Sequence, residues 1–223
     1  MLNRDDLIVL EDVPGFNDID LQELVEYFEK YICANEFTYE CLNEVGKPTT
    51  IVIKAIPGNF AHLSGVDKCA APHYGALNIT NHLRDGSWSK SHISGLDQSN
   101  NKTTTNYKDA KVRMRYLATV YKLLQNPSVI QFNPNNVVKG TWIKSKYLMS
   151  GVIGNRWVHL GVDVPEEFVE GTIPEVTFPR TLLIEKTEKF IDNQYEYAVN
   201  EVLIKSKAID DGVEAVVETS EIN

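Results

Sequence analysis

Long apolar runs and closely paired cysteines are missing from this sequence of 223 residues. No stretch approaches 18 uninterrupted apolar residues, which argues against a membrane-spanning helix. The first 15 residues differ from a signal peptide, because their short apolar run is flanked by acids. Three cysteines occur, at positions 33, 41 and 69, and no pair has C-x-x-C spacing. We therefore expect reduced thiols, no membrane association and a cytoplasmic location, in the host cell if a phage encodes the chain.

The common catalytic signatures are also missing. The sequence has no phosphate-binding loop, dinucleotide fingerprint, nucleophile elbow or H-E-x-x-H motif. Its five histidines stand at positions 62, 73, 82, 92 and 159, whereas zinc ligands usually occur in close pairs. No carboxylate cluster suited to magnesium accompanies them. We therefore expect no cofactor and no metal.

Charge is present but unevenly distributed. The net charge is −9, and residues 1–44 alone carry 2 basic and 12 acidic groups. Residues 102–147 carry nine Lys and Arg against the single acid Asp109, a net charge of +8. This asymmetry predicts a local anion-binding patch, although an ordinary solvated basic face would give the same pattern.

The order of expected elements indicates an α+β fold. Apolar residues at three- and four-residue spacing predict helices over about 18–37 and 107–126, and alternation predicts a β-hairpin over about 36–56. After Pro127 the alternating segments predict an antiparallel sheet of four or more strands. We expect an extension over 1–18, a single domain over 19–208 with a long polar loop at about 68–105, and a disordered acidic tail over 209–223.

Three polar residues are candidates on their own chemistry. An imidazole at His62, in a segment of small residues, suits proton transfer near neutral pH, although it could equally bond backbone groups. Lys144 lies mid-strand in the expected strand around residues 142–147, where an exposed lysine is the commoner case. Thr177 is also typical of an ordinary strand residue.

The order of short motifs resembles the phage-associated group of barnase–EndoU–colicin–RelE-like nucleases, in particular its fourth phage subgroup. The resemblance spans about residues 22–206 and rests on ordered segments: Asn59–Gly65, which is similar to F-x-H-L-x-G, then 143–148, 159–160, 176–178 and 190–194. The chain departs from the group at Phe178-Pro179, where two aromatics are usual, and in the longer polar stretch 68–105.

The resemblance implies a barnase/RelE-like sheet and metal-independent cleavage of RNA through the ribose 2′-OH. It implies that His62 transfers protons and that Lys144, Arg115 and Thr177 bind the phosphate, so that His62, Lys144 and Thr177 converge on one concave face. His159 and Gln194 are further catalytic candidates. Four more residues are expected to bind RNA: Lys108, Lys111, Lys146 and Arg180.

Three functions remain open at this point. The first is an endoribonuclease, as an effector encoded by a phage or another mobile element. The second is a catalytically silent RNA- or protein-binding accessory protein of the same fold, and the third is a structural phage protein. RNA is the expected partner, together with an inhibitor or a host protein.

Overall fold

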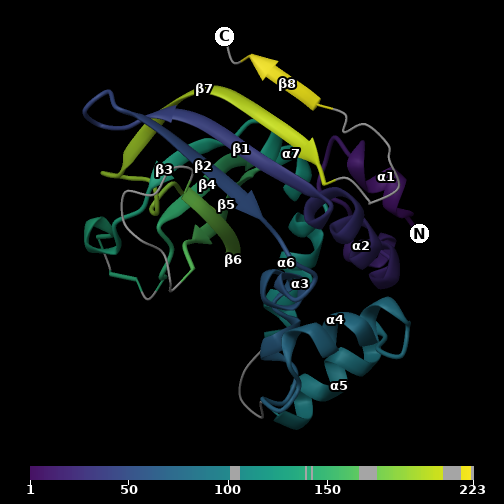
Figure 1. The fold of residues 1–223 in the computed structure, drawn as a ribbon. Coiled ribbons are helices and arrows are strands. Elements are labelled where there is room, and N and C mark those ends of the chain that lie inside the picture. The colour runs from purple at the N-terminus through teal and green to yellow at the C-terminus, as the bar shows by residue number, and fades with distance from the viewer. Residues whose placement is uncertain (101–105, 139, 142, 166–174, 208–216, 222–223) are drawn as a thin grey trace. The chain divides into compact units, whose positions relative to one another are not determined.

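The structure is a computed structural model, and it describes residues 1–100, 106–138, 140–141, 143–165, 175–207 and 217–221 (Figure 1). Its contacts divide the chain into two compact units. The helical unit consists of Met1–Cys33 and Ile56–Tyr121, and the barrel unit of Ala34–Ala55 and Lys122–Asn223. Such a division does not decide whether the chain unfolds in one step, so the single domain over 19–208 stays a prediction.

The helical unit is built from short helices. They are α1 (Arg4–Ile8), α2 (Leu21–Tyr27), the π-helical η2 (Phe28–Cys33), α3 (Asn59–Ser64), α4 (Ala76–Arg84), α5 (Lys90–Asn100) and α6 (Asn106–Leu117), with the 3-10 turns η1 (Phe16–Asp18) and η3 (Val66–Lys68). Helix α7 (Val120–Gln125) begins in this unit and ends in the barrel unit. In the described part of the chain, no helix is long and apolar enough to cross a membrane.

Helix α2 forms where the sequence predicts the first helix. The Asp20 side chain accepts the backbone N–H groups of Gln22 and Glu23 and so caps the helix. Leu24 and Val25 are fully buried on the inward face. The expected extension 1–18 joins the same unit, because Leu2 forms a parallel bridge to Ile19.

The prediction of a polar loop over 68–105 is wrong for residues 76–84 and 90–100, which form α4 and α5, and its last part, 101–105, lies outside the described residues. Each helix buries a narrow stripe, Ile79 and Leu83 on α4 and Ile93 on α5, while the remaining positions are mostly polar. A stripe this narrow is a weak sequence signal, because packing rather than propensity stabilises such helices. The predicted helix 107–126 is likewise divided into α6 and α7.

The barrel unit holds the described strands. They are β1 (Asn35–Leu42), β2 (Pro48–Lys54), β3 (Ser128–Gln131), β4 (Tyr147–Ile153), β5 (Arg156–Asp163), β6 (Glu175–Glu185), β7 (Tyr195–Ser206) and β8 (Val217–Glu221), with the 3-10 turn η4 (Pro134–Asn136) before β4. The sheet order is β1-β2-β6-β5-β4-β3-β7-β8, and an additional β1–β7 pairing joins the ends of the first seven. The result is a closed, mixed, seven-stranded barrel, with β8 added along β7 (Figure 1).

Register explains which face of the first strands is buried. The hairpin of β1 and β2 forms as predicted, with Phe37 opposite Ile53. Phe37 also pairs with Ile204 of β7. All three side chains are at most 7% exposed, so this shared face packs into the core of the barrel.

The predicted α+β fold with a barnase- or RelE-like antiparallel sheet is wrong. The sheet closes on itself, and β2 pairs with β6 in parallel, through Val52 and Val176. Alternation along a strand shows which residues face the core, but it does not name the neighbouring strand. Both pairings that set this topology, β1–β7 and β2–β6, join segments more than 100 residues apart.

Two further expectations about strands fail. Lys144 does not lie on a strand, because β4 begins at Tyr147. The predicted disordered tail is wrong for Val217–Glu221, which forms β8. This strand pairs antiparallel with residues 201–205 of β7. Residues 209–216 and 222–223 lie outside the described residues.

Close packing between β5 and its neighbours gives a stability prediction. A Cβ added at Gly161 would lie 2.5 Å from the Ser145 hydroxyl and 2.7 Å from the Thr181 methyl. We expect Gly161→Ala to lower the free energy of unfolding by about 1–3 kcal/mol through overpacking. Urea unfolding monitored by circular dichroism measures the change.

Gly95→Ala is the matched control, because a Cβ there meets nothing within 4 Å and Gly95 lies inside α5. It should stabilise the chain by about 0.5–1 kcal/mol through helix propensity. A Gly161→Ala protein as stable as the wild type would contradict the described packing of Gly161 against Ser145 and Thr181.

Candidate functional site

His62 is placed by α3 rather than by the loop that the sequence suggests. Its neighbours Phe60, Ala61 and Leu63 are fully buried, so His62 is the position of this turn that faces outward. Gly65, at φ +75°, ends the helix in the left-handed conformation that glycine adopts most easily. The imidazole therefore stands at the surface of the helical unit, with its side chain 52% exposed.

Asp67 orients the His62 ring. In η3, five residues after His62, its Oδ2 lies 2.7 Å from His62 Nδ1. The imidazole tautomer protonated at Nδ1 donates this hydrogen bond and leaves Nε2 as the proton-accepting nitrogen. Asp67 is itself three-quarters buried, and its Oδ1 has no hydrogen-bond partner among the described residues. A histidine held by a carboxylate in this way can act as a general base.

Arg113 brings a positive charge to the same place. Helix α6 packs on α3 at Gly65, where an added Cβ would lie 3.0 Å from Arg113 Cδ and 3.6 Å from Ala110 Cα. Burial lowers the pKa of the half-buried Arg113, whereas the nearby carboxylates of Asp67 and Asp109 raise it. No described residue forms a hydrogen bond or ion pair with its guanidinium. Its donors therefore remain available to an anion.

The other basic residues of α6 divide into two groups. Arg115 donates from Nε to the carbonyl of Pro14 at 2.7 Å, so it fastens the N-terminal segment, and its role in phosphate binding stays a prediction. Lys108 is exposed, and the Lys111 ammonium lies 5.2 Å from the ring centre of Tyr107. Lys108 and Lys111 share the helical unit with His62, so their role in RNA binding stays a prediction.

Four of the candidates in the barrel unit have structural partners. Thr177 is 1% exposed and donates to the carbonyl of Val52 at 3.0 Å. Gln194 accepts the N–H of Asn133 and donates to its carbonyl. The remaining two form ion pairs, Lys146 with Glu175 at 2.6 Å and Arg180 with Asp163 at 2.5 Å.

His159 lies buried in the barrel unit, and its catalytic role stays a prediction. It is fully buried on β5, where Nδ1 lies 2.8 Å from the Ser150 hydroxyl and the ring stacks on Trp157. Phe190 covers the ring edge-on, and Nε2 has no partner among the described residues. Burial, with a smaller effect of Lys189, lowers the pKa of His159 to about 4. A neutral ring shielded from solvent fits a core position.

The three residues predicted to converge, His62, Lys144 and Thr177, are divided between the two units. His62 belongs to the helical unit, and the other two belong to the barrel unit. Because Thr177 is buried and bonded to Val52, its hydroxyl is engaged within the barrel. Lys144 is exposed, and its part in a shared site stays a prediction.

The sequence reasoning missed Asp67 and Arg113. Asp67 follows His62 by five residues, and Gly65 between them is the signal that could have indicated the pair, because its left-handed conformation ends α3 and turns the chain back toward the imidazole. Arg113 stands two residues before Arg115, and the sequence gives no reason to prefer either as the phosphate-binding residue. Only the structure shows that Arg113 is the one that packs on Gly65, next to His62. Cys69, close by, is no nucleophile at neutral pH, because burial raises the pKa of its thiol to about 12.

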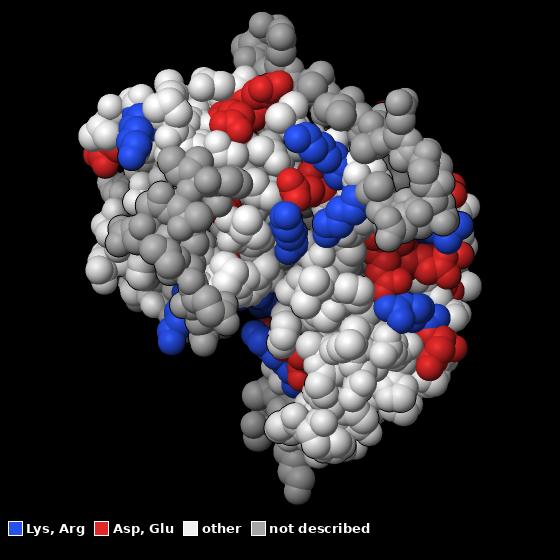
Figure 2. All heavy atoms as spheres, in the orientation of Figure 1, with Lys and Arg blue, Asp and Glu red and all other residues white. Residues whose placement is uncertain are grey.

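One face of the molecule carries charges of both signs. On the face drawn in Figure 2, Lys and Arg side chains lie next to Asp and Glu side chains rather than forming one continuous basic area. No three His, Cys, Asp or Glu side chains in the described ranges are grouped so as to hold a metal ion.

Comparison with known proteins finds no matching family model, no matching curated protein and no matching solved structure. The functional argument therefore depends on the chemistry of the site itself.

The buried His159 predicts how stability depends on pH. An unfolded histidine has a pKa near 6.5, so between about pH 6.5 and 4 the unfolded chain binds a proton that the folded chain does not. Acidification through this window therefore favours unfolding, by roughly 2 kcal/mol between pH 7 and pH 5. We expect His159→Gln to show a shallower loss of unfolding free energy in urea over this range.

His73→Gln is the control, because His73 is exposed. The unfolding free energy of the His73→Gln protein should change with pH as that of the wild type does. If unfolding free energy fell equally with pH in the wild type and in the His159→Gln protein, protonation of His159 would not be the cause of the acid destabilisation.

Proposed function

We propose that the helical unit carries a metal-independent endoribonuclease site centred on His62. The observation that supports it most is the 2.7 Å hydrogen bond from the exposed imidazole to Asp67, because it fixes the ring and favours the tautomer in which Nε2 can accept a proton. Arg113, packed against Gly65 beside this pair, supplies a cation for a phosphate.

RNA suits this set of side chains because it brings its own nucleophile. The neighbouring Cys69 is held as a thiol, and the buried Ser64 hydroxyl donates to the carbonyl of Ala61. A site with a base and a cation, but without an activated side-chain nucleophile, can still cleave a phosphodiester whose ribose 2′-OH attacks. DNA lacks that hydroxyl and should be inert.

The proposed reaction is an attack of O2′ on phosphorus that displaces O5′. Nε2 of His62 takes the proton of the 2′-OH, O2′ bonds to phosphorus, and the bond from phosphorus to O5′ breaks. O5′ takes a proton from the imidazolium or from water, which leaves a 2′,3′-cyclic phosphate and a 5′-OH. Arg113 is suited to stabilise the doubly charged phosphorane between these steps. On this proposal the chain would act on host RNA, as an effector encoded by a phage or another mobile element.

One observation favours a second candidate, an RNA- or protein-binding accessory protein without catalytic activity. Four of the predicted site residues form hydrogen bonds or ion pairs within the barrel unit: Thr177, Gln194, Lys146 and Arg180. Few of the predicted catalytic side chains in that unit are therefore available to a substrate. The same experiment separates the two candidates, because both would bind RNA but only the first would cleave it.

The direct test is cleavage of a labelled single-stranded RNA by the purified chain in EDTA. We expect 2′,3′-cyclic phosphate products, and a loss of about 100-fold or more in rate for His62→Ala, the scale of general acid–base catalysis. Asp67→Asn should lower kcat, because the amide no longer selects the Nδ1–H tautomer. Arg113→Gln should weaken phosphate binding.

His73→Ala is the matched control, since it removes another exposed imidazole of the same unit. It should cleave RNA like the wild type, and a 2′-O-methyl substrate should resist all variants. Cleavage that survives His62→Ala, or no cleavage by the folded wild type, would overturn the proposal and leave the binding module.

A further inference from the structure

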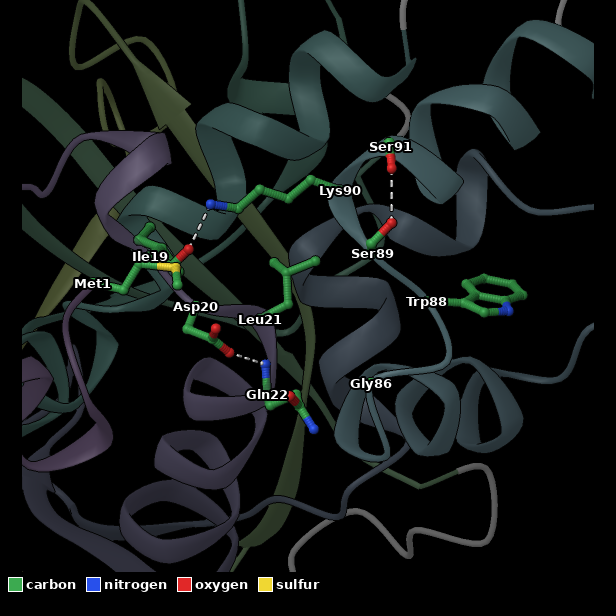
Figure 3. A pocket seen from close by; sticks show the side chains of 10 residues that line it. All are labelled: Met1, Ile19, Asp20, Leu21, Gln22, Gly86, Trp88, Ser89, Lys90 and Ser91. Atoms are coloured by element: carbon green, nitrogen blue, oxygen red, sulfur yellow. Dashed lines mark hydrogen bonds between the residues drawn. The ribbon is translucent and has the colours of Figure 1, made fainter.

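The cavity of the helical unit is lined by groups that the chain itself engages. It has a volume of about 420 Å³ and lies between the start of α2 and the connection from α4 to α5 (Figure 3). Asp20 caps α2, and the Lys90 ammonium donates to backbone carbonyls. The rings of His82 and His92 both stack on Trp88. The clearer docking surface lies in the barrel unit, along the edge of β7.

Strand β7 is longer than its partners on one of its two sides. Strand β1 pairs with β7 from Ala198 to Ser206. On the other side, β3 pairs only with residues 195–197 and β8 only with residues 201–205. Without β8, the part of β7 beyond β3 would present a row of backbone donors and acceptors to any extended chain. This edge accepts a strand, because β8 already pairs with it.

A groove opens between the part of β7 that pairs with β3 and the part that pairs with β8. It has a volume of about 580 Å³ and is lined by residues 126–128, at the start of β3, and by residues 196–199 of β7. All of these residues belong to the barrel unit. Toward β3, the pairing of β8 reaches only to Glu201. A longer strand on the same edge would therefore continue into this groove.

The sequence of β8 suits this edge poorly on the core side. Val202 and Ile204 of β7 are at most 7% exposed, so they face the core of the barrel. The register places Ser220 opposite Val202 and Glu218 opposite Ile204. Directly opposite residues of an antiparallel pair share one face of the sheet. Two polar residues of β8 therefore occupy register positions that apolar residues would fill better.

The other face carries a row of like charges. Glu40 of β1 and Glu221 of β8 both lie opposite Glu201 of β7, so three glutamates occupy neighbouring register positions across three strands. Like charges directly opposite each other destabilise a strand pair. The Thr50 hydroxyl donates to Glu40, but no described residue forms a hydrogen bond or ion pair with the Glu201 carboxylate. A cation on the neighbouring strand would therefore be favoured at this position.

We propose that the edge of β7 over residues 198–205 binds an extended segment of a partner protein by strand addition, and that this segment displaces β8. The backbone ladder supplies affinity, and side chains at alternate positions supply selectivity. The segment carries apolar residues opposite Val202 and Ile204 and a Lys or Arg opposite Glu201, and its next residues lie in the groove. Until the partner binds, β8 covers the edge and keeps it from pairing with other chains.

The test is fluorescence anisotropy of labelled peptides titrated with the full chain. The matched peptide is acetyl-Val-Val-Thr-Val-Lys-Thr-Thr-amide, and the comparison peptide, acetyl-Val-Glu-Thr-Ser-Glu-Thr-Thr-amide, starts with the sequence of β8. We expect the matched peptide to bind at least about tenfold more tightly than the comparison peptide. N-methylation of its backbone amides should abolish this binding, because strand addition depends on backbone hydrogen bonds.

A charge reversal tests the register. Glu201→Lys should weaken binding of the matched peptide about tenfold and strengthen binding of a third peptide that has Glu in place of its Lys. The gain for the third peptide also shows that the variant is folded. Glu188→Lys is the matched control, because it changes the net charge equally and the exposed Glu188 lies between β6 and β7. It should bind the matched peptide like the wild type.

The proposal would be overturned by equal binding of the matched and comparison peptides, by no binding of either, by binding that survives N-methylation, or by equal effects of Glu201→Lys and Glu188→Lys. A dimer that forms with rising concentration of the chain, and that the matched peptide does not dissociate, would overturn it as well and assign the edge to β8 of a second copy. None of these results bears on RNA cleavage at His62.

Discussion

The pairing of β1 with β7 is the constraint on which the barrel unit depends. It runs from Asn35 opposite Ser206 to Leu42 opposite Ala198, so it links the first strand of the chain to its last long strand. Without it the sheet would be open, and β1 and β7 would each expose a row of backbone donors and acceptors. With it, the face that carries Phe37 and Tyr39 packs inward, and both residues are at most 1% exposed.

Closure also decides which polar residues are left for function. The parallel β2–β6 pairing brings Thr177 to the carbonyl of Val52, and the β4–β5 pairing brings His159 to Ser150. Both side chains thereby satisfy buried groups of the barrel. His62 lies on a short helix with three buried neighbours, and its imidazole faces outward with Asp67 as its partner. Chemistry with a substrate is therefore better supported in the helical unit than in the barrel.

The sequence predicts local features better than long-range ones. The apolar spacing of the first helix and the alternation of the hairpin are encoded within a few residues, and α2 and the β1–β2 hairpin form within these two segments. The narrow stripes of α4 and α5 gave no comparable signal. The partner of β2 could not be derived, because the alternation of Ile51 and Ile53 is equally compatible with any neighbouring strand.

The candidate site follows the same pattern. His62 stands out because an imidazole among small residues is chemically suggestive, whereas Arg113 acquires its role only from its approach to Gly65. Arg115 and Gln194 look equally suitable in the sequence, and the structure shows that they form hydrogen bonds to Pro14 and Asn133. A side chain's partners in the fold, rather than its type, separate a binding residue from a structural one.

The most direct test of this account follows the ring signals of the five histidines by NMR while a 2′-O-methyl RNA oligonucleotide, which binds without being cleaved, is added. Variants that each lack one histidine assign the signals. The account predicts that the His62 signal shifts with RNA and that the signal of the buried His159 does not. Shifts confined to other histidines, or none at all at RNA concentrations well above that of the protein, would contradict it.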